Sequence, residues 1–242
     1  MQLEIKKEIV MSVNTAVPQA GQEFVSAQRI NRSLTAGVER CALQWMAEHA
    51  PAWLTSDQLT LLGLIAQIAA GLCYALSRYD HFFLLVGILC LALNWFGDSM
   101  DGTLARVRNQ QRPRYGFYVD HMVDVFGALA LMGGLGFSRL LHWPVAAALL
   151  VCFLLLSSES FLATYTLHRF QLSQGIFGPT ELRILLIMGN LAAFRTPFCA
   201  LFGHRMLLFD LGGGIGAVGM FLLAIVITLR HTALLYRQEP LS

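Results

Sequence analysis

Two pairs of aspartates within one short stretch are the residues of this sequence best suited to chemistry. Asp98 and Asp101 are three residues apart, and Asp120 and Asp124 are four apart. On α-helices such spacings place both members of a pair on one face. A short basic segment separates the pairs, so the two helices are expected to run antiparallel with their acidic faces opposed. Grouped carboxylates can bind divalent cations, and one of them can accept the proton of an attacking hydroxyl.

These four residues, called the acidic quartet below, lie in apolar surroundings that limit what can neutralise them. An acidic side chain inside a membrane segment costs several kcal/mol on insertion scales, and four that face one another also repel. One divalent cation, or two, would neutralise this charge directly. An all-oxygen ligand set suits magnesium, manganese or calcium rather than zinc.

Small and basic residues flank the quartet. Gly102 and Gly116 leave room for a ligand to approach the helix backbone, and Ala105 is small and lies one turn beyond Asp101. Four arginines surround the predicted mouth: Arg106, Arg108, Arg112 and Arg114. A guanidinium binds phosphate oxygens with two hydrogen bonds at once, but arginines here also suit anchoring on the cytoplasmic side. The pattern predicts a site for a phosphate-rich, partly lipidic substrate.

The composition predicts that membrane helices position this site. The chain has 242 residues, of which 56% are hydrophobic and 13% charged, and its mean hydropathy is +0.58, whereas soluble domains carry about 25% charged residues. The net charge of +2 gives no reason to expect a nucleic-acid partner. Six stretches approach the roughly 20 apolar residues of a spanning helix: 59–77, 82–105, 116–137, 143–166, 182–201 and 211–229.

The expected fold is therefore an all-α integral membrane protein, a six-helix bundle with a polar cavity open to the cytoplasm. Residues 1–30 are expected to be poorly ordered, 31–55 to form a juxtamembrane amphipathic segment, and 56–236 to form the six-helix domain. The fifth span, 182–201, is expected to be interrupted near its end, because Pro197 should kink or end the helix. All lysines and arginines but four fall on the side of the termini, which predicts cytoplasmic termini; the four are Arg78, Arg139, Arg195 and Arg205.

The stretch around the quartet resembles the signature of the CDP-alcohol phosphotransferases, D-x2-D-G-x2-A-R followed by G-x3-D-x3-D. Its fixed positions are all matched here, by Asp98, Asp101, Gly102, Ala105, Arg106, Gly116, Asp120 and Asp124. A weaker likeness covers residues 56–63, which are similar to the segment that enters the family's first helix. There, Asp57 and Thr60 are candidates for nucleotide contact, and a helix cap by Ser56 or Asp57 is the alternative.

The resemblance implies a role for each matched residue. Asp98, Asp101 and Asp120 would hold Mg²⁺ or Mn²⁺, as a pair of ions, and Asp124 would be both a ligand and the catalytic proton acceptor. The CDP group would be received by Gly102, Ala105, Arg106 and Gly116. The implied protein is a homodimeric, multi-pass enzyme of the cell membrane that makes phospholipid from a CDP-linked donor and an alcohol acceptor.

Three functions remain open at this stage. The first is transfer of a phosphatidyl group from CDP-diacylglycerol to a small alcohol with release of CMP. The second uses CDP-choline or CDP-ethanolamine as donor and diacylglycerol as acceptor. The third, of another class, is a metal-ion transporter, for which Glu159 and Asn190 are the only further polar groups along a path. A phosphate-bearing acceptor would need a basic pocket, and Arg169 and Arg183 are its candidates; Glu181 is a candidate contact to the headgroup.

Overall fold

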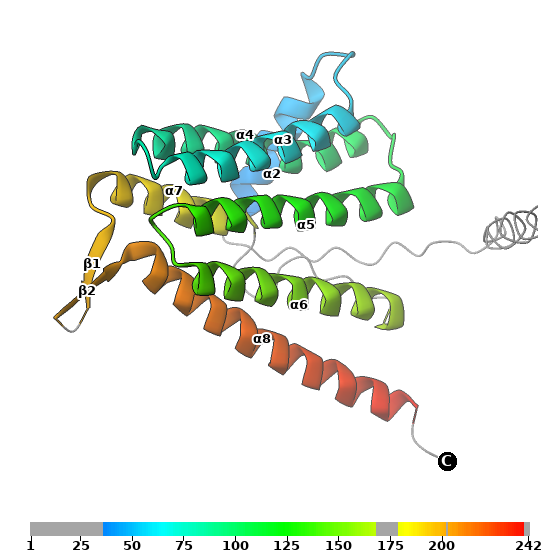
Figure 1. Ribbon diagram of the computed structural model, residues 1–242. Helices are drawn as coiled ribbons and strands as arrows, with labels where there is room; N and C mark the ends of the chain where they lie inside the picture. Colours follow the sequence, from blue (N-terminus) through cyan, green and yellow to red (C-terminus); the bar gives the residue numbers. More distant parts are fainter. Residues whose placement is uncertain (1–35, 168–178, 202, 240–242) are drawn as a thin grey trace, which may run out of the picture.

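A computed structural model of the chain describes residues 36–167, 179–201 and 203–239. The segment 1–30, expected to be poorly ordered, lies outside these ranges. The described elements are helices α2 (Ala36–Glu48), α3 (Ser56–Leu76), α4 (Phe82–Val107), α5 (Pro113–Phe137), α6 (Trp143–Leu167), α7 (Pro179–Arg195) and α8 (Leu208–Gln238), and strands β1 (Phe198–Leu201) and β2 (His204–Leu207). In Figure 1 the long helices α3 to α6 lie side by side, with α8 inclined along α6.

Five helices of the described part are long and apolar enough to cross a bilayer: α3, α4, α5, α6 and α8. These correspond to five of the six expected spans, and the helical membrane fold is confirmed to that extent. The remaining expectation, 182–201, differs from the structure. Helix α7 has 17 residues and ends at Arg195, since Pro197 has no N–H to continue it. An antiparallel hairpin of β1 and β2 follows and turns at Gly203, whose φ is +82°.

The start of α3 shows how the chain enters the bundle. Thr55 is the N-cap: its side chain accepts a hydrogen bond from the backbone N–H of Gln58, and the Gln58 side chain accepts from the N–H of Thr55. This reciprocal pair satisfies two N–H groups that a helix start leaves without partners. The expected cap at Ser56 or Asp57 is therefore off by one or two residues. Both of those side chains are instead free to bind the neighbouring helices.

Helix α3 packs against both α4 and α5 and forms the centre of the site-bearing half. Glycines allow this close approach. A Cβ on Gly97 of α4 would lie 2.6 Å from the carbonyl oxygen of Leu59 and 2.7 Å from the amide nitrogen of Gly63. Both contacts are to backbone atoms, so only glycine fits at this crossing. This close crossing of α3 and α4 holds Asp98, the residue after Gly97, next to α3.

Helix α2 falls within the expected amphipathic segment 31–55 and docks on the bundle through one face. Leu43 and Ala47 are buried with Leu59, Met100 and Leu104 in a small apolar cluster. The linker that follows α2 is fixed by the side chain of a single arginine. Arg108 donates hydrogen bonds to the carbonyl oxygens of Leu54 (2.5 Å), Pro51 (2.8 Å) and Ala50 (3.1 Å).

Helices α6 and α8 form the other side of the bundle, and most of their surface is not covered by protein. Two histidine–carboxylate contacts join them, one near each end. His142, just before α6, contacts Asp210 in the first turn of α8. Toward the other end, Nδ1 of His231 lies 2.5 Å from Oε1 of Glu159. Glu159 thus has a partner on the adjacent helix, which accounts for an acidic residue in an apolar span.

Candidate functional site

Helices α3, α4 and α5 together line one pocket, and all four members of the acidic quartet are among its lining residues. Asp98 and Asp101 come from α4, and Asp120 and Asp124 come from α5. Helices α4 and α5 run in opposite directions (Figure 1), as the short segment between the two pairs predicted. The other lining residues are Thr60, Gly63 and Gln67 of α3, Asn94 of α4 and Val123 of α5.

The carboxylate of Asp101 is buried and held by α3. The hydroxyl of Thr60 donates to Asp101 Oδ2 at 2.5 Å, and the backbone N–H of Gly102 donates to the other oxygen at 2.5 Å. A second residue of α3, Ser56, donates its hydroxyl to the backbone carbonyl of Asp101 at 3.0 Å. These bonds fix both the side chain and the turn of helix that carries it.

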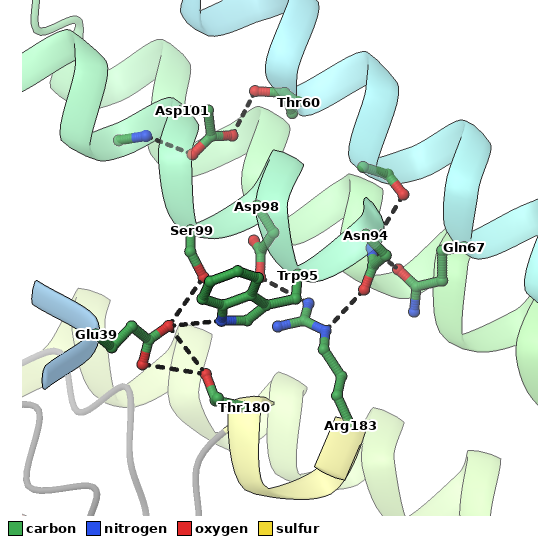
Figure 2. Close-up of polar contacts among 12 residues, drawn as sticks. Glu39, Thr60, Gln67, Asn94, Trp95, Asp98, Ser99, Asp101, Thr180 and Arg183 are labelled. Carbon is green, nitrogen blue, oxygen red and sulfur yellow. Dashed lines mark hydrogen bonds and ion pairs between the residues drawn. The ribbon is translucent and has the colours of Figure 1, made fainter. Parts of the chain in front are cut away.

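Asp98 is the more accessible acid of α4 and has a cationic partner from another helix. Nη2 of Arg183, on α7, donates to Asp98 Oδ2 at 2.7 Å, and its Nε donates to Asn94 Oδ1 at 2.7 Å (Figure 2). The Arg183 side chain is 12% exposed, against 40% for Asp98. A largely buried guanidinium next to four carboxylates offsets part of their mutual repulsion.

Two side-chain amides continue the polar lining one turn and more away from the acids. Asn94 is buried, and its NH₂ group donates to the carbonyl oxygen of Gly63 at 2.9 Å and to Gln67 Oε1 at 3.2 Å. Arg183, Asn94 and Gln67 therefore form a connected chain of hydrogen bonds from α7 through α4 to α3 (Figure 2). Such a chain specifies the relative position of the three helices.

The residues expected to receive a CDP group lie beyond the quartet, near the ends of α4 and α5. Ala105 and Arg106 are in the last turn of α4, and Gly116 is in the first turn of α5. Gly102, Ala105, Arg106 and Gly116 are not among the residues that line the pocket. A Cβ built on Gly116 would have no atom within 4 Å. No atom of the described residues therefore fills the space beside Gly116, and its use by a ligand stays a prediction.

Two of the four arginines near the expected mouth are used to join chain segments. Arg108 binds the carbonyls of the linker before α3. Arg112 forms an ion pair with Asp57 in the first turn of α3, and this hydrogen bond raises the pKa of the guanidinium. Asp57, a candidate for nucleotide contact, has its carboxylate in this pair. The guanidinium groups of Arg108 and Arg112 thus both bind other segments of the chain.

The donor chemistry of the quartet fits a divalent cation, because four carboxylates meet around one pocket. Their charges act on one another: Asp124 interacts electrostatically with Asp98, Asp101 and Asp120. Within the ranges that the structure describes, no three acidic, histidine or cysteine side chains are grouped tightly enough to enclose an ion. In this arrangement Asp98 is bound to Arg183, and Asp101 is bound to Thr60.

Several residues of the site were not predicted from the sequence. Asn94 and Gln67 lie inside apolar spans, where a buried amide is itself a signal of a polar cavity. Thr60 and Arg183 were candidates, but for contacts to nucleotide and to a phosphate-bearing acceptor rather than to the quartet. Arg169, the other basic candidate, lies outside the described residues.

An acidic pocket between apolar, membrane-length helices defines a class of integral membrane proteins with a charged intramembrane site. Within this class, a family model for CDP-alcohol phosphatidyltransferase matches residues 53–229. The match covers most of the chain, and the chain belongs to that family. It includes the whole acidic quartet, α7 and most of α8, and it begins just before α3. A search of curated proteins found no individual match. Family membership makes the chain a phosphotransferase of lipid biosynthesis.

Proposed function

We propose that the chain transfers a phosphatidyl group from CDP-diacylglycerol to a small alcohol and releases CMP. The observation that carries this proposal is the meeting of Asp98, Asp101, Asp120 and Asp124 around one pocket within the family domain. The acyl chains of such a donor would remain in the bilayer, while its pyrophosphate would reach the acids at the α4–α5 end of the bundle. The proposed sidedness places that end in the cytoplasm; both termini share that side if α7 also crosses the bilayer, since the other five crossings alone would separate them.

The proposed reaction is a substitution at the phosphorus that carries the diacylglycerol. The alcohol oxygen forms a new P–O bond, and the bond to the bridging oxygen of the pyrophosphate breaks, so that this oxygen leaves with CMP. Asp124 accepts the proton of the alcohol. Such a positioned base contributes on the order of 10²- to 10⁴-fold to a rate. The small residues Gly102, Ala105 and Gly116 would leave space for the CDP group, with Arg106 beside it.

Asp98, Asp101, Asp120 and Asp124 would hold the Mg²⁺ or Mn²⁺ that this family implies. When bound, such ions supply charge neutralisation and stabilise the phosphoryl oxygens. Arg183 lies beside Asp98, so its guanidinium can bind a phosphate oxygen once the carboxylate has another cationic partner. This position fits the donor pyrophosphate or the phosphate of a phosphorylated acceptor.

The test is release of CMP by the purified full-length protein in mixed micelles with Mg²⁺ or Mn²⁺. CDP-diacylglycerol and CDP-ethanolamine are supplied separately with a panel of acceptors: serine, inositol phosphate, glycerol phosphate and diacylglycerol. Asp124→Asn is compared with Glu239→Gln, a control on the exposed residue after α8. We expect CMP with CDP-diacylglycerol and a small alcohol, a loss of about 10³-fold in Asp124→Asn, and an unchanged rate in Glu239→Gln.

Each other outcome points to a named alternative. CMP released only with CDP-ethanolamine and diacylglycerol would reverse the roles of donor and acceptor. Folded protein that binds Mn²⁺ but releases no CMP with any pair would favour the metal-ion transporter. The implied homodimer is tested on the same preparation from the molar mass of the protein in the micelle.

A further inference from the structure

Glu39, on the helix that precedes the matched family domain, makes a group of contacts that the proposed reaction does not use. Its Oε1 accepts hydrogen bonds from the indole N–H of Trp95 at 2.8 Å and from the hydroxyl of Ser99 at 3.1 Å. The hydroxyl of Thr180 lies 3.2 Å and 3.3 Å from its two carboxylate oxygens. One side chain of α2 thus joins α4 to α7 (Figure 2).

The docking of α2 itself does not depend on this carboxylate. Leu43 and Ala47 follow Glu39 by one and two turns on the same face, and both are buried against α3 and α4. Arg108 holds the linker at the far end of α2. Glu39 therefore extends an already anchored face of α2 toward α7. Hydrogen bonds to an ionised acceptor are about twice as strong as neutral ones, which suits a contact that must fix a separate helix.

Glu39 and Arg183 bind neighbouring residues on the same two turns of α4. Trp95 and Ser99 bind Glu39, and the residues preceding them, Asn94 and Asp98, bind Arg183. On α7, Thr180 and Arg183 are three residues apart and share a face. Helix α7 is thus held on α4 by two adjacent sets of bonds, one through α2 and one directly to the quartet.

We infer that Glu39 is a positioning residue, which fixes α7 so that the guanidinium of Arg183 stays at the site beside the quartet. The carboxylate sets the position of Thr180 relative to Trp95 and Ser99, and the next turn of α7 then presents Arg183 to the quartet. Helix α2, which lies before the matched family domain, is thereby part of the structure that supports the site. This inference rests on the proposed function only where it concerns activity; the placement of α7 is independent of it.

The first test is a double-mutant cycle on CMP formation, with Glu39→Ala, Arg183→Gln and the double variant. Glu39→Ala is expected to raise the KM of the CDP-linked donor about 10-fold in the parent background. When Arg183 is already Gln, the rise should be less than about 2-fold, because both substitutions act through the same guanidinium. Glu39→Gln keeps Oε1 as an acceptor and should stay within about 3-fold of the parent. Thr180→Val, which removes the hydroxyl, should reproduce Glu39→Ala. Equal effects of Glu39→Ala in both backgrounds would overturn the inference.

The second test needs no activity. Hydrogen exchange of amides in the first turns of α7, residues 180–186, is compared between the parent, Glu39→Ala and Glu48→Ala. Glu48 is exposed on the same helix, and among the described residues it accepts a hydrogen bond only from Gln44 of α2, at 3.1 Å. We expect faster exchange in Glu39→Ala alone, and unchanged exchange would refute the positioning. If the parent protein releases no CMP, the proposed function fails, while this measurement still decides whether Glu39 holds α7.

Discussion

The hydroxyl of Thr60 on α3 donates to the buried carboxylate of Asp101 on α4 at 2.5 Å, so a neutral donor from one helix orients an acid of the next. Thr60→Val keeps the shape of the side chain and removes this donor. Because a hydrogen bond to a charged group contributes about 1.5–3 kcal/mol, we expect at least a roughly 10-fold loss of CMP formation. Thr60→Ser restores a hydroxyl and should recover most of the activity. Equal activity in the Val and Ser variants would show that this hydrogen bond does not contribute to activity.

Substitution of Gly116 should affect stability and donor binding differently. A Cβ there meets no atom within 4 Å, so Gly116→Ala should leave the free energy of unfolding unchanged or raise it by about 0.5–1 kcal/mol, as alanine favours helix. If the open space receives the CDP group, the KM of the donor should nevertheless rise. Gly133→Ala, at an equally open position of the same helix, is the control and should change stability alone. The readouts are thermal unfolding in micelles and the KM of CMP formation.

Gly97→Ala, unlike Gly116→Ala, should lower the free energy of unfolding. The added methyl group would meet the backbone of Leu59 and Gly63, which cannot move aside without separating α3 from α4. We expect a loss of about 3 kcal/mol, at the upper end of overpacking costs, measured by SDS titration in mixed micelles. The separation also draws Thr60 away from Asp101, so activity per folded molecule should fall. A variant with normal stability would show that the two helices do not pack this closely.

Arg108→Ala tests whether this arginine acts on the fold rather than on phosphate. Three backbone carbonyls before α3 lose their donor, and we expect a loss of about 1–3 kcal/mol in stability. The KM of the CDP-linked donor should stay within about 2-fold of the parent. Arg237→Ala, at the exposed end of α8, is the control for removing a positive charge. A large rise in KM with unchanged stability would instead assign Arg108 to phosphate binding.

The elements of this protein that follow from local physics could be predicted from its sequence. The spacing of Asp98, Asp101, Asp120 and Asp124 predicted their opposed faces, because helical periodicity alone determines which residues share a side. Long apolar stretches predicted five of the spans, since the bilayer selects for length and hydropathy. Pro197 likewise indicated where α7 ends.

Contacts between distant segments could not be predicted in this way. The donor set of Glu39 comes from residues 56, 60 and 141 positions away, and no local pattern indicates that a surface-helix glutamate reaches α7. Arg108 belongs to a basic run that suits phosphate as well as a turn; only the path of the linker before α3 decides between them. The cap at Thr55 was missed because Ser56 and Asp57 are equally good capping residues.

The paired contacts between α6 and α8 have a mechanical consequence. His142 and Glu159 lie about 25 Å apart along α6 at 1.5 Å per residue, close to the hydrocarbon thickness of about 30 Å, and each is tied to α8. Two contacts this far apart resist sliding of α8 along α6 and rotation of α8 about its own axis. We therefore expect the two helices to tilt together when the bilayer becomes thicker or thinner.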